Sequence, residues 1–194
     1  EGCLRRLCFS GLRGVAAPQG ALIMARAYLS LGSNLGDSRA YLQQAVAAME
    51  ENADFLLLAK SSLYRSSPWG KKGQADFLNA AVIVESPLAP LELLAFCQNL
   101  EEQAGRQRLE HWGSRTLDVD IIAIEGVCST EQPLLLPHPY YQERLFVLAP
   151  LFEIAGDLAL APGFPGLAAL LESCRAKDKK EEQRIEVIAG PNAW

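Results

Sequence analysis

The chain has 194 residues, of which 49% are apolar and 21% are charged, so it is long enough for one globular domain with a sizeable core. Its formal net charge of −5, from 18 basic and 23 acidic residues, argues against a general nucleic-acid binder, which normally carries a basic excess. No apolar run approaches the ~20 residues that a membrane-spanning helix needs. The five cysteines are scattered without a C-x-x-C pair, which indicates a reducing compartment and no zinc site. We therefore expect a cytoplasmic protein.

Residues 1–23 differ from the rest of the chain, because they contain three arginines, four glycines and only one acidic residue. Met24 followed by Ala25 resembles a start, so we interpret residues 1–23 as an extension that does not belong to the domain, such as a tag or a mis-assigned start. A transit peptide is the alternative, since such peptides are Arg-rich and poor in acidic residues. We expect residues 24–194 to form the domain.

The domain is predicted to begin with a strand over residues 27–31. It ends in the turn sequence G-S-N-L-G-D of residues 32–37, in which Asp37 or Ser38 can cap the next helix. The apolar stripe of that helix is Leu42, Ala45, Val46 and Met49. Residues 55–65 and 77–85 are predicted strands, joined by a loop too long for a tight hairpin, and loops of this length in a compact domain are often functional.

A second helix is predicted over residues 91–104, with Leu93, Leu94, Cys97 and Leu100 on one face and Gly105 at its end. A strand over residues 116–122 follows. The resulting order β-α-β-β-α-β predicts an α+β fold, the ferredoxin-like sandwich, with a C-terminal extension. For that extension we expect an irregular segment at 133–150, short helices at 150–156 and 167–174, a solvated link at 176–184 and a last strand at 185–188.

The most informative stretch is residues 105–121, which sets Arg106, Arg108 and Arg115 beside Asp118 and Asp120. In an alternating strand both aspartates share one face, with their Cα atoms roughly 6.5–7 Å apart. Like charges so close repel unless water or a cation lies between them. Mg²⁺ is the natural candidate, because carboxylates and substrate phosphates are its usual ligands, and arginines bind phosphate in a planar fork. The alternative is a solvated polar strand face after a charged loop.

Phe77 and Asn79 point to the same side of the predicted strand 77–85. An aromatic ring and a carboxamide on one surface suit a flat heterocycle, because the ring stacks on it and the amide pairs with its edge. The alternative is that Phe77 belongs to the core and Asn79 hydrogen-bonds near a turn.

Several motifs, in order and at consistent spacing over residues 25–171, resemble the 6-hydroxymethyl-7,8-dihydropterin pyrophosphokinase family, which transfers pyrophosphate from ATP to a pterin alcohol in folate biosynthesis and releases AMP. They are LGSNLGD (31–37), YR with Pro68 (64–65), DFLNAA (76–81), GRQR (105–108), WGSRTLDVDI (112–121), LPHP (136–139) and PLFEIA (150–155). The family fold is ferredoxin-like, in agreement with the element order above.

The resemblance implies a metal and phosphate region. Asp118 and Asp120 would bind two Mg²⁺ ions that bridge the ATP phosphates, while Arg106 and Arg115 would contact phosphate and complete the catalytic set. The other implied ATP contacts are Gln98, Glu101, Ile121 and His138, together with Arg108 and Trp112, which would close over the site.

The resemblance also implies a pterin region, in which Phe77 and Phe146 would hold the heterocycle between them. The other implied pterin contacts are Asn79, the backbone around Ser66 and Trp69, and Arg144, which would also approach the phosphates. The substrates would then be ATP and a dihydropterin alcohol, bound by a monomer that contacts neither nucleic acid nor membrane.

The chain departs from the family pattern between Arg108 and Trp112. The loop there is one residue shorter, His111 stands where the family usually has arginine, and Ser114 replaces the usual proline. These departures bear on the closing of the loop rather than on the reaction. No residue is required as a general base, since phosphoryl-type transfer can run on positioning and charge neutralisation.

Two other classes of function remain open from the sequence. A ferredoxin-like regulatory module would bind ATP without forming AMP. A structural subunit whose arginines bind an acidic partner would not depend on Mg²⁺.

Overall fold

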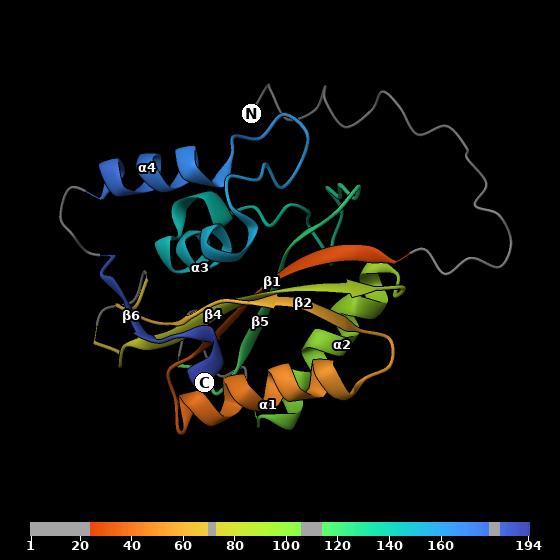
Figure 1. The fold of residues 1–194 in the computed structure, drawn as a ribbon, viewed down its shortest axis with the longest axis horizontal. Helices are drawn as coiled ribbons and strands as arrows, with labels where there is room; N and C mark the ends of the chain where they lie inside the picture. Colours follow the sequence, from red (N-terminus) through yellow and green to blue (C-terminus); the bar gives the residue numbers. More distant parts are fainter. Residues whose placement is uncertain (1–23, 70–72, 106–113, 179–182) are drawn as a thin grey trace, which may run out of the picture.

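The computed structural model of the protein describes residues 24–69, 73–105, 114–178 and 183–194. Within them the chain forms a mixed α/β structure, in which one antiparallel sheet carries helices on both faces (Figure 1). None of the helices in these four stretches is long and apolar enough to cross a membrane. The predicted extension at residues 1–23 lies outside the described residues.

The strands of the sheet are β1 (Ala25–Ser33), β2 (Leu56–Lys60), β3 (Leu63–Ser66), β4 (Phe77–Ser86), β5 (Asp118–Ile124) and β6 (Ile185–Ala189). The helices are α1 (Ser38–Glu51), α2 (Pro90–Gln103), α3 (Leu145–Ala155) and α4 (Leu167–Lys177), with short 3-10 helices at Tyr141–Glu143 and Pro191–Ala193. The strand order is β5-β1-β4-β3-β6, and β2 also pairs with β4. Every pairing is antiparallel.

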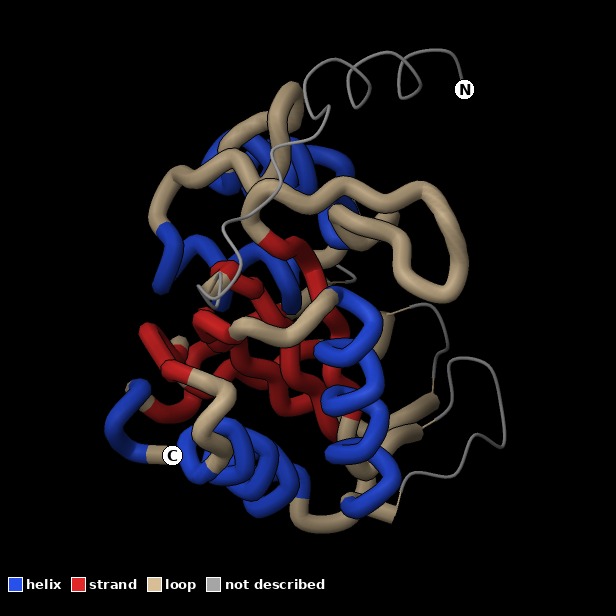
Figure 2. The backbone as a smooth tube through the Cα atoms, turned by 90° about the vertical axis from the view of Figure 1, so that its right-hand side faces the viewer, coloured by secondary structure: helices blue, strands red, loops and turns tan. Residues whose placement is uncertain are grey.

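Helices α1 and α2 cover one face of the sheet, and α3 and α4 cover the other (Figure 1). Strands β1, β4 and β5 are mostly buried between them, whereas β2 and β6 have exposed residues. Figure 2 shows the strands as a layer between these two groups of helices. Alternate residues of β1 therefore enter different cores: Leu29 and Leu31 pack with α1 and α2, whereas Tyr28 packs with α3 and α4.

The helices that were predicted from apolar periodicity are present. The buried stripe of α1 is the predicted one, Leu42, Ala45, Val46 and Met49. Asp37 caps this helix through its side chain, which accepts a hydrogen bond from the Ala40 N–H at 3.1 Å. Leu93, Cys97 and Leu100 are buried on α2, and Gly105 follows it with φ of 73°, the left-handed conformation typical of a helix end.

The prediction of one strand over residues 55–65 was wrong, because β2 and β3 are separated at Ser61 and Ser62. Lys60 pairs with Val82 and Tyr64 with Asn79, so three residues of this strand oppose two of β4. The Ser61 hydroxyl accepts the Ala81 N–H at 2.9 Å and donates to the Ser62 carbonyl at 2.7 Å. A serine side chain thus replaces a backbone group of the ladder and produces a bulge.

Residues 133–150 were predicted to be irregular and residues 150–156 to form a helix, but α3 already begins at Leu145. Pro150 was taken as the first residue of a helix, which is its usual position, whereas it lies inside α3. The helix tolerates the lost backbone hydrogen bond because it is fixed by burial, with Leu145, Val147, Leu148 and Leu151 all in the core beside α4.

The predicted solvated link at 176–184 is also different in the structure. Helix α4 continues to Lys177, and residues 179–182 lie outside the described residues. Gln183 is partly buried, and its side chain accepts from the Leu145 N–H at 2.9 Å and donates to the Glu143 carbonyl at 3.1 Å. The end of this segment is therefore attached to the start of α3.

Candidate active site

A cleft opens on the α3 side of the sheet, where β1, β3, β4 and β5 come together near the first turn of α3. Its lining residues that were predicted as site residues are Ser66, Trp69, Phe77, Asn79, Arg115, Asp118, Asp120, Arg144 and Phe146. Four further lining residues were not predicted: Ser30, Gly32, Ser67 and Gln74. The structure thus brings together segments that are more than a hundred residues apart in the chain.

The sheet register explains this convergence. Gly32 of β1 pairs with Asp118 of β5 on one side and with Asn79 of β4 on the other. Asp118 and Asn79 are therefore two strand spacings apart, about 10 Å. A side chain at position 32 would intrude between them, since a Cβ there would lie 3.3 Å from Asn79 Oδ1 and 4.0 Å from Asp118 Cβ. Glycine leaves the floor of the cleft open.

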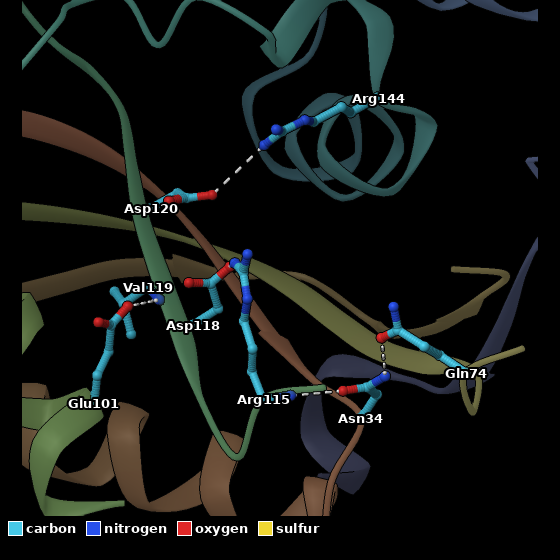
Figure 3. A network of polar contacts seen from close by, with 8 residues as sticks. All are labelled: Asn34, Gln74, Glu101, Arg115, Asp118, Val119, Asp120 and Arg144. Carbon is cyan, nitrogen blue, oxygen red and sulfur yellow. Dashed lines mark hydrogen bonds and ion pairs between the residues drawn. The ribbon is translucent and has the colours of Figure 1, made fainter. Parts of the chain in front are cut away.

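The carboxylates of Asp118 and Asp120 each have an arginine partner, and the partners come from different parts of the fold (Figure 3). Asp118 is paired with Arg115, three residues earlier, through Arg115 Nη1 and Asp118 Oδ2. Asp120 lies 3.7 Å from Arg144 Nη1 at the start of α3. The two ion pairs are only partly exposed, so solvent screens them less than it would screen pairs on an open surface.

Burial raises the pKa of the Asp120 carboxyl above its usual range, and the charge of Asp118 adds to this effect. Arg144 and Arg115 oppose the rise without cancelling it. A carboxyl whose pKa is raised by burial and by a like charge gains from a cation beside it. The described residues contain no group of three or more His, Cys, Asp or Glu side chains that could hold a metal. Mg²⁺ often takes only one or two carboxylates from a protein and its other oxygen ligands from phosphates and water, so these two carboxylates could hold such an ion.

Asn34 fixes the backbone that carries Arg115. Its Oδ1 accepts the Arg115 N–H at 2.8 Å, and its own N–H donates to the Arg115 carbonyl at 3.0 Å. Its Nδ2 donates to Gln74 Oε1 at 3.3 Å and to the Ala75 carbonyl at 3.2 Å (Figure 3). The turn after β1 thus connects the segment before β5 to the loop before β4, a role that goes beyond the predicted helix cap.

The carboxamide of Asn79 has a defined orientation in the cleft. Asn79 is 2% exposed, and its Nδ2 donates to Ser66 Oγ at 2.9 Å. The amide nitrogen is thus directed to β3, and Oδ1 lies on the side of Gly32 as a hydrogen-bond acceptor. A ligand that contacts this oxygen must offer a hydrogen-bond donor.

Arg144 also contacts the aromatic part of the cleft. Its guanidinium carbon lies 4.9 Å from the centre of the Trp69 ring and 5.8 Å from that of Phe146, and the ring of Tyr140 is 5.6 Å away. These are cation–π distances. Because Phe77 lines the same cleft, the rings provide apolar faces next to the charged residues.

The predicted ATP contacts on α2 and β5 have different environments. Glu101 is buried, and its carboxylate accepts the Val119 N–H at 2.9 Å next to the two aspartates. Gln98 is exposed on α2 and does not line the cleft. The side chain of Ile121 is buried in the core beneath α1 and α2, so a ligand could contact it only through the backbone of β5, which is an edge strand.

His138 is a neutral hydrogen-bonding group at neutral pH. Burial and, to a smaller extent, the positive charge of the nearby Arg144 together lower the pKa of its imidazole to about 4. Nδ1 accepts the Tyr140 N–H at 3.2 Å, so the ring hydrogen is on Nε2. The His138 N–H donates to the Ile122 carbonyl at 2.8 Å, which attaches this residue to β5.

Three predicted site residues, Arg106, Arg108 and Trp112, lie outside the described residues, as does His111. Of the four lining residues that were not predicted, Ser30 could have been found, because it is the one polar residue in the predicted strand 27–31 besides Tyr28 and lies two residues before Gly32. Ser67 and Gln74 lie in an irregular loop, where no periodicity indicates direction.

Comparison with known proteins gives one consistent result. The family model described as 7,8-dihydro-6-hydroxymethylpterin-pyrophosphokinase (HPPK) matches residues 28–156. A 2-amino-4-hydroxy-6-hydroxymethyldihydropteridine pyrophosphokinase of Methylorubrum extorquens is 45% identical over 163 residues, which are 84% of this chain and 100% of that protein. The Bacillus subtilis protein of the same name is 46% identical over 128 residues, which are 66% of this chain and 77% of that protein.

Longer proteins contain the same region. A bifunctional protein FolKE of Lactococcus lactis subsp. cremoris is 39% identical over 85% of this chain and 46% of its own length. A crystal structure of Plasmodium falciparum HPPK-DHPS, a triple mutant with SDX-DHP, is similar with a TM-score of 0.66 over 86% of this chain and 50% of that chain. At 15% identity this likeness concerns the fold alone.

Proposed function

This chain belongs to the 7,8-dihydro-6-hydroxymethylpterin-pyrophosphokinase family, and from that premise we propose which of its residues perform the transfer. The enzyme transfers the pyrophosphoryl group of ATP to the hydroxymethyl group of 6-hydroxymethyl-7,8-dihydropterin, a step of folate biosynthesis, and AMP leaves. ATP and the pterin alcohol are its substrates.

The observation that carries our assignment is the row formed by Asp118, Gly32 and Asn79 across β5, β1 and β4. One end of the row offers carboxylates and arginines for phosphate and metal, and the other end offers an amide and rings for a flat heterocycle. The open floor at Gly32 lets the two substrates lie side by side, as a direct transfer between them requires.

The pterin is proposed to bind between Phe77 and Phe146, with Ser66 and Trp69 at its edge. The acceptor Oδ1 of Asn79 suits the N–H and amino groups on the pyrimidine edge of a pterin, because its Nδ2 is already bonded to Ser66. Arg144 lies between the rings and Asp120, so it can contact both the heterocycle and the phosphates.

Asp118 and Asp120 are proposed to hold two Mg²⁺ ions together with the ATP phosphates. Bound there, Mg²⁺ would neutralise charge on the phosphate oxygens. Arg115, whose backbone is held by Asn34, is proposed to bind phosphate in a fixed position, and Arg106 to act with it in catalysis. The other proposed ATP contacts are Gln98, Glu101, Arg108, Trp112, Ile121 and His138.

Within the described residues we assign no general base. His138 is a weak base because its pKa is lowered to about 4, and its Nδ1 already accepts a hydrogen bond. The residues of the cleft would instead promote the reaction by orienting the hydroxymethyl oxygen towards the β-phosphorus and by stabilising the charge on the leaving AMP.

We further propose that the fold is of the ferredoxin-like type. The split strand β2 and β3 would count as one strand, so that the element order becomes β-α-β-β-α-β and the strand order matches that topology. A monomer in the cytoplasm is proposed as well. The buried free cysteines Cys97 and Cys174 support a reducing environment.

The function is tested by incubating the protein with the pterin alcohol, ATP and Mg²⁺ and separating the nucleotides. AMP should form only when all three are present. A regulatory module would bind ATP without forming AMP. A structural subunit would bind its acidic partner equally well with and without Mg²⁺. Formation of ADP and a phosphorylated pterin would contradict pyrophosphoryl transfer.

A further inference from the structure

Helix α3 and strand β3 form two opposite sides of the proposed pterin slot. Phe146 and Arg144 belong to the start of α3, and Ser66, which accepts the Asn79 amide, is the last residue of β3. The width of the slot therefore depends on how α3 is held against β3. Two sets of hydrogen bonds connect these elements, one directly near the end of α3 and one at its start through residues 183 and 184.

The first connection is made by Glu153, near the end of α3. Its carboxylate accepts the Ser62 N–H at 2.9 and 3.1 Å, the Ser62 hydroxyl at 2.8 Å and the Tyr64 hydroxyl at 2.7 Å. Ser62 lies in the bulge between β2 and β3, so its N–H is turned out of the ladder and directed to the helix. One carboxylate thus receives hydrogen bonds from the bulge and from β3.

Tyr64 connects this carboxylate to the slot itself. Side chains alternate along a strand, so Tyr64 and Ser66 point to the same face of β3, towards α3. Tyr64 pairs with Asn79 in the sheet register, and Ser66 binds the Asn79 side chain. Burial and the hydrogen bond to Glu153 raise the pKa of the Tyr64 hydroxyl, so it remains a donor at neutral pH.

The second connection lies at the start of α3, next to the slot. The Gln183 side chain binds the Leu145 N–H and the Glu143 carbonyl. The adjacent residue Arg184 exchanges two hydrogen bonds with Ser67, one from the Arg184 N–H to Ser67 Oγ and one from the Ser67 N–H to the Arg184 carbonyl, both at 3.0 Å. Helix α3 is thus connected to β3, or to the residue that follows it, at both of its ends. We call these two connections, through Glu153 and through Gln183 with Arg184, the frame of the slot, which lies between them.

Neither Glu153 nor Gln183 lines the cleft. Glu153 is seven residues after Phe146 on α3, about 10 Å along the helix axis, and cannot touch a ligand that lies between Phe77 and Phe146. Its hydrogen bonds are nevertheless with the strand that orients Asn79. An effect of Glu153 on the pterin would have to act through the position of α3 relative to β3.

We propose that Glu153 is a positioning residue for the pterin site: by binding Ser62 and Tyr64 it sets the separation of α3 and β3, and with it the distance between the Phe146 ring and the Asn79 amide. The bridge through Gln183 sets the other end of the same frame. This inference rests on the proposed pterin slot. It assigns the PLFEIA and YR motifs a shared role, the joining of the two walls of that slot.

The test compares Glu153→Ala with Glu153→Gln, Tyr64→Phe and the control Glu172→Ala, which removes the same charge from an exposed position of α4. For each variant of the full chain, affinity for the pterin alcohol and for a non-hydrolysable ATP analogue with Mg²⁺ is measured by titration, well below the melting temperature. Because Glu153→Ala removes the carboxylate that joins α3 to Ser62 and Tyr64, the two walls of the slot should shift relative to each other, and pterin binding should weaken by at least about tenfold, the effect of about 1.4 kcal/mol. Affinity for the nucleotide should change by less than about twofold.

The other variants should follow a defined order. Glu153→Gln keeps one acceptor oxygen and should restore most of the pterin affinity, while Tyr64→Phe, which loses a single hydrogen bond, should have an intermediate effect. Glu172→Ala should behave as wild type. In steady-state assays Glu153→Ala should raise KM for the pterin with little change in kcat, because no group that contacts the reacting atoms is altered.

Two results would overturn the inference. If Glu153→Ala lowered the melting temperature while the folded protein bound the pterin as wild type, Glu153 would only stabilise the fold. If pterin and nucleotide affinity fell equally, the loss would be general. The variant Asn79→Ala separates this from a failure of the proposed function: unchanged pterin binding in Asn79→Ala would refute the slot itself, whereas weakened binding there with normal binding in Glu153→Ala would refute the positioning role alone.

Discussion

The guanidinium of Arg144 lies 3.7 Å from the carboxylate of Asp120, and its carbon lies 4.9 Å from the centre of the Trp69 ring. One side chain thus contacts both the charged and the aromatic part of the cleft. The charged and the aromatic parts of the cleft are therefore joined through Arg144.

Replacing either aspartate, Asp118→Asn or Asp120→Asn, should reduce turnover by several orders of magnitude. Charge neutralisation by a bound metal is worth several kcal/mol of the barrier, and about 1.4 kcal/mol corresponds to a factor of ten in rate. The fold should persist, because asparagine has nearly the same shape. Turnover is measured by AMP release and folding by thermal melting; near-normal turnover of a variant at ordinary Mg²⁺ concentration would remove that residue from the metal site.

The metal-free protein should become more stable near neutral pH when Asp120 is replaced by asparagine. The folded-state pKa of this carboxyl is raised above its ordinary value of about 3.9. At pH values between the unfolded-state and the folded-state pKa, the Asp120 carboxyl binds more protons in the folded protein than in the unfolded chain. The contribution of this carboxyl to the free energy of unfolding therefore decreases as the pH rises. Asp120→Asn removes that decrease.

Thermal melting across a pH series measures this effect. Asp120→Asn should raise the melting temperature at neutral pH and change it little at acidic pH. With the proposed binding of Mg²⁺ to the charged carboxylate, the ion should stabilise the wild-type protein more at neutral than at acidic pH, and the variant much less. A variant that is less stable than wild type at neutral pH would show that Arg144 outweighs burial at this site.

Replacing the rings, Phe77→Ala or Phe146→Ala, should weaken pterin binding by roughly 1–3 kcal/mol, by analogy with the loss of an aromatic partner that stacks on a nucleic-acid base. The affinity for the nucleotide should change much less. If both rings were core residues instead, alanine would cost about 3–5 kcal/mol in the free energy of unfolding. Calorimetric titration of each ligand beside thermal melting distinguishes these cases, and unchanged pterin affinity in a destabilised variant would contradict stacking.

A methyl group on the floor of the cleft should disturb the pterin end. In Gly32→Ala the new Cβ would lie 3.3 Å from Asn79 Oδ1, tighter than ordinary contact, so the amide must shift. We expect a loss of about tenfold in pterin affinity, the effect of about 1.4 kcal/mol. Gly190→Ala is the control, since a Cβ there meets nothing within 4 Å. If both variants bound the pterin with equal affinity, the Asn79 amide would not contribute to pterin binding.

The sequence predicts those parts of the fold that are determined by residues close together in the chain. The buried stripe of α1, its Asp37 cap and the Gly105 helix end all follow from periodicity and from backbone preferences. The alternation that places Asp118 and Asp120 opposite the buried Val119 is equally local. These features were confirmed.

What the sequence does not predict depends on partners far along the chain. The bulge at Ser61 and Ser62 arises because a serine side chain competes with the backbone, and its outward N–H is bound by Glu153, 91 residues away. The contact of Asn34 with Arg115 joins residues 81 positions apart. Contacts between residues so far apart leave no periodic pattern in the sequence. The residues of the site could therefore be named through the family resemblance, whereas their grouping in one cleft required the structure.

The central claim, that this cleft transfers an intact pyrophosphoryl group from ATP to the pterin, is tested most directly by following the phosphorus atoms. Parallel reactions use ATP radiolabelled at the α- or at the β-phosphorus, with the pterin alcohol and Mg²⁺. We predict that the β-label appears in the pterin product and the α-label in AMP. A β-label that remained in a nucleotide product, or a pterin product without it, would contradict the account.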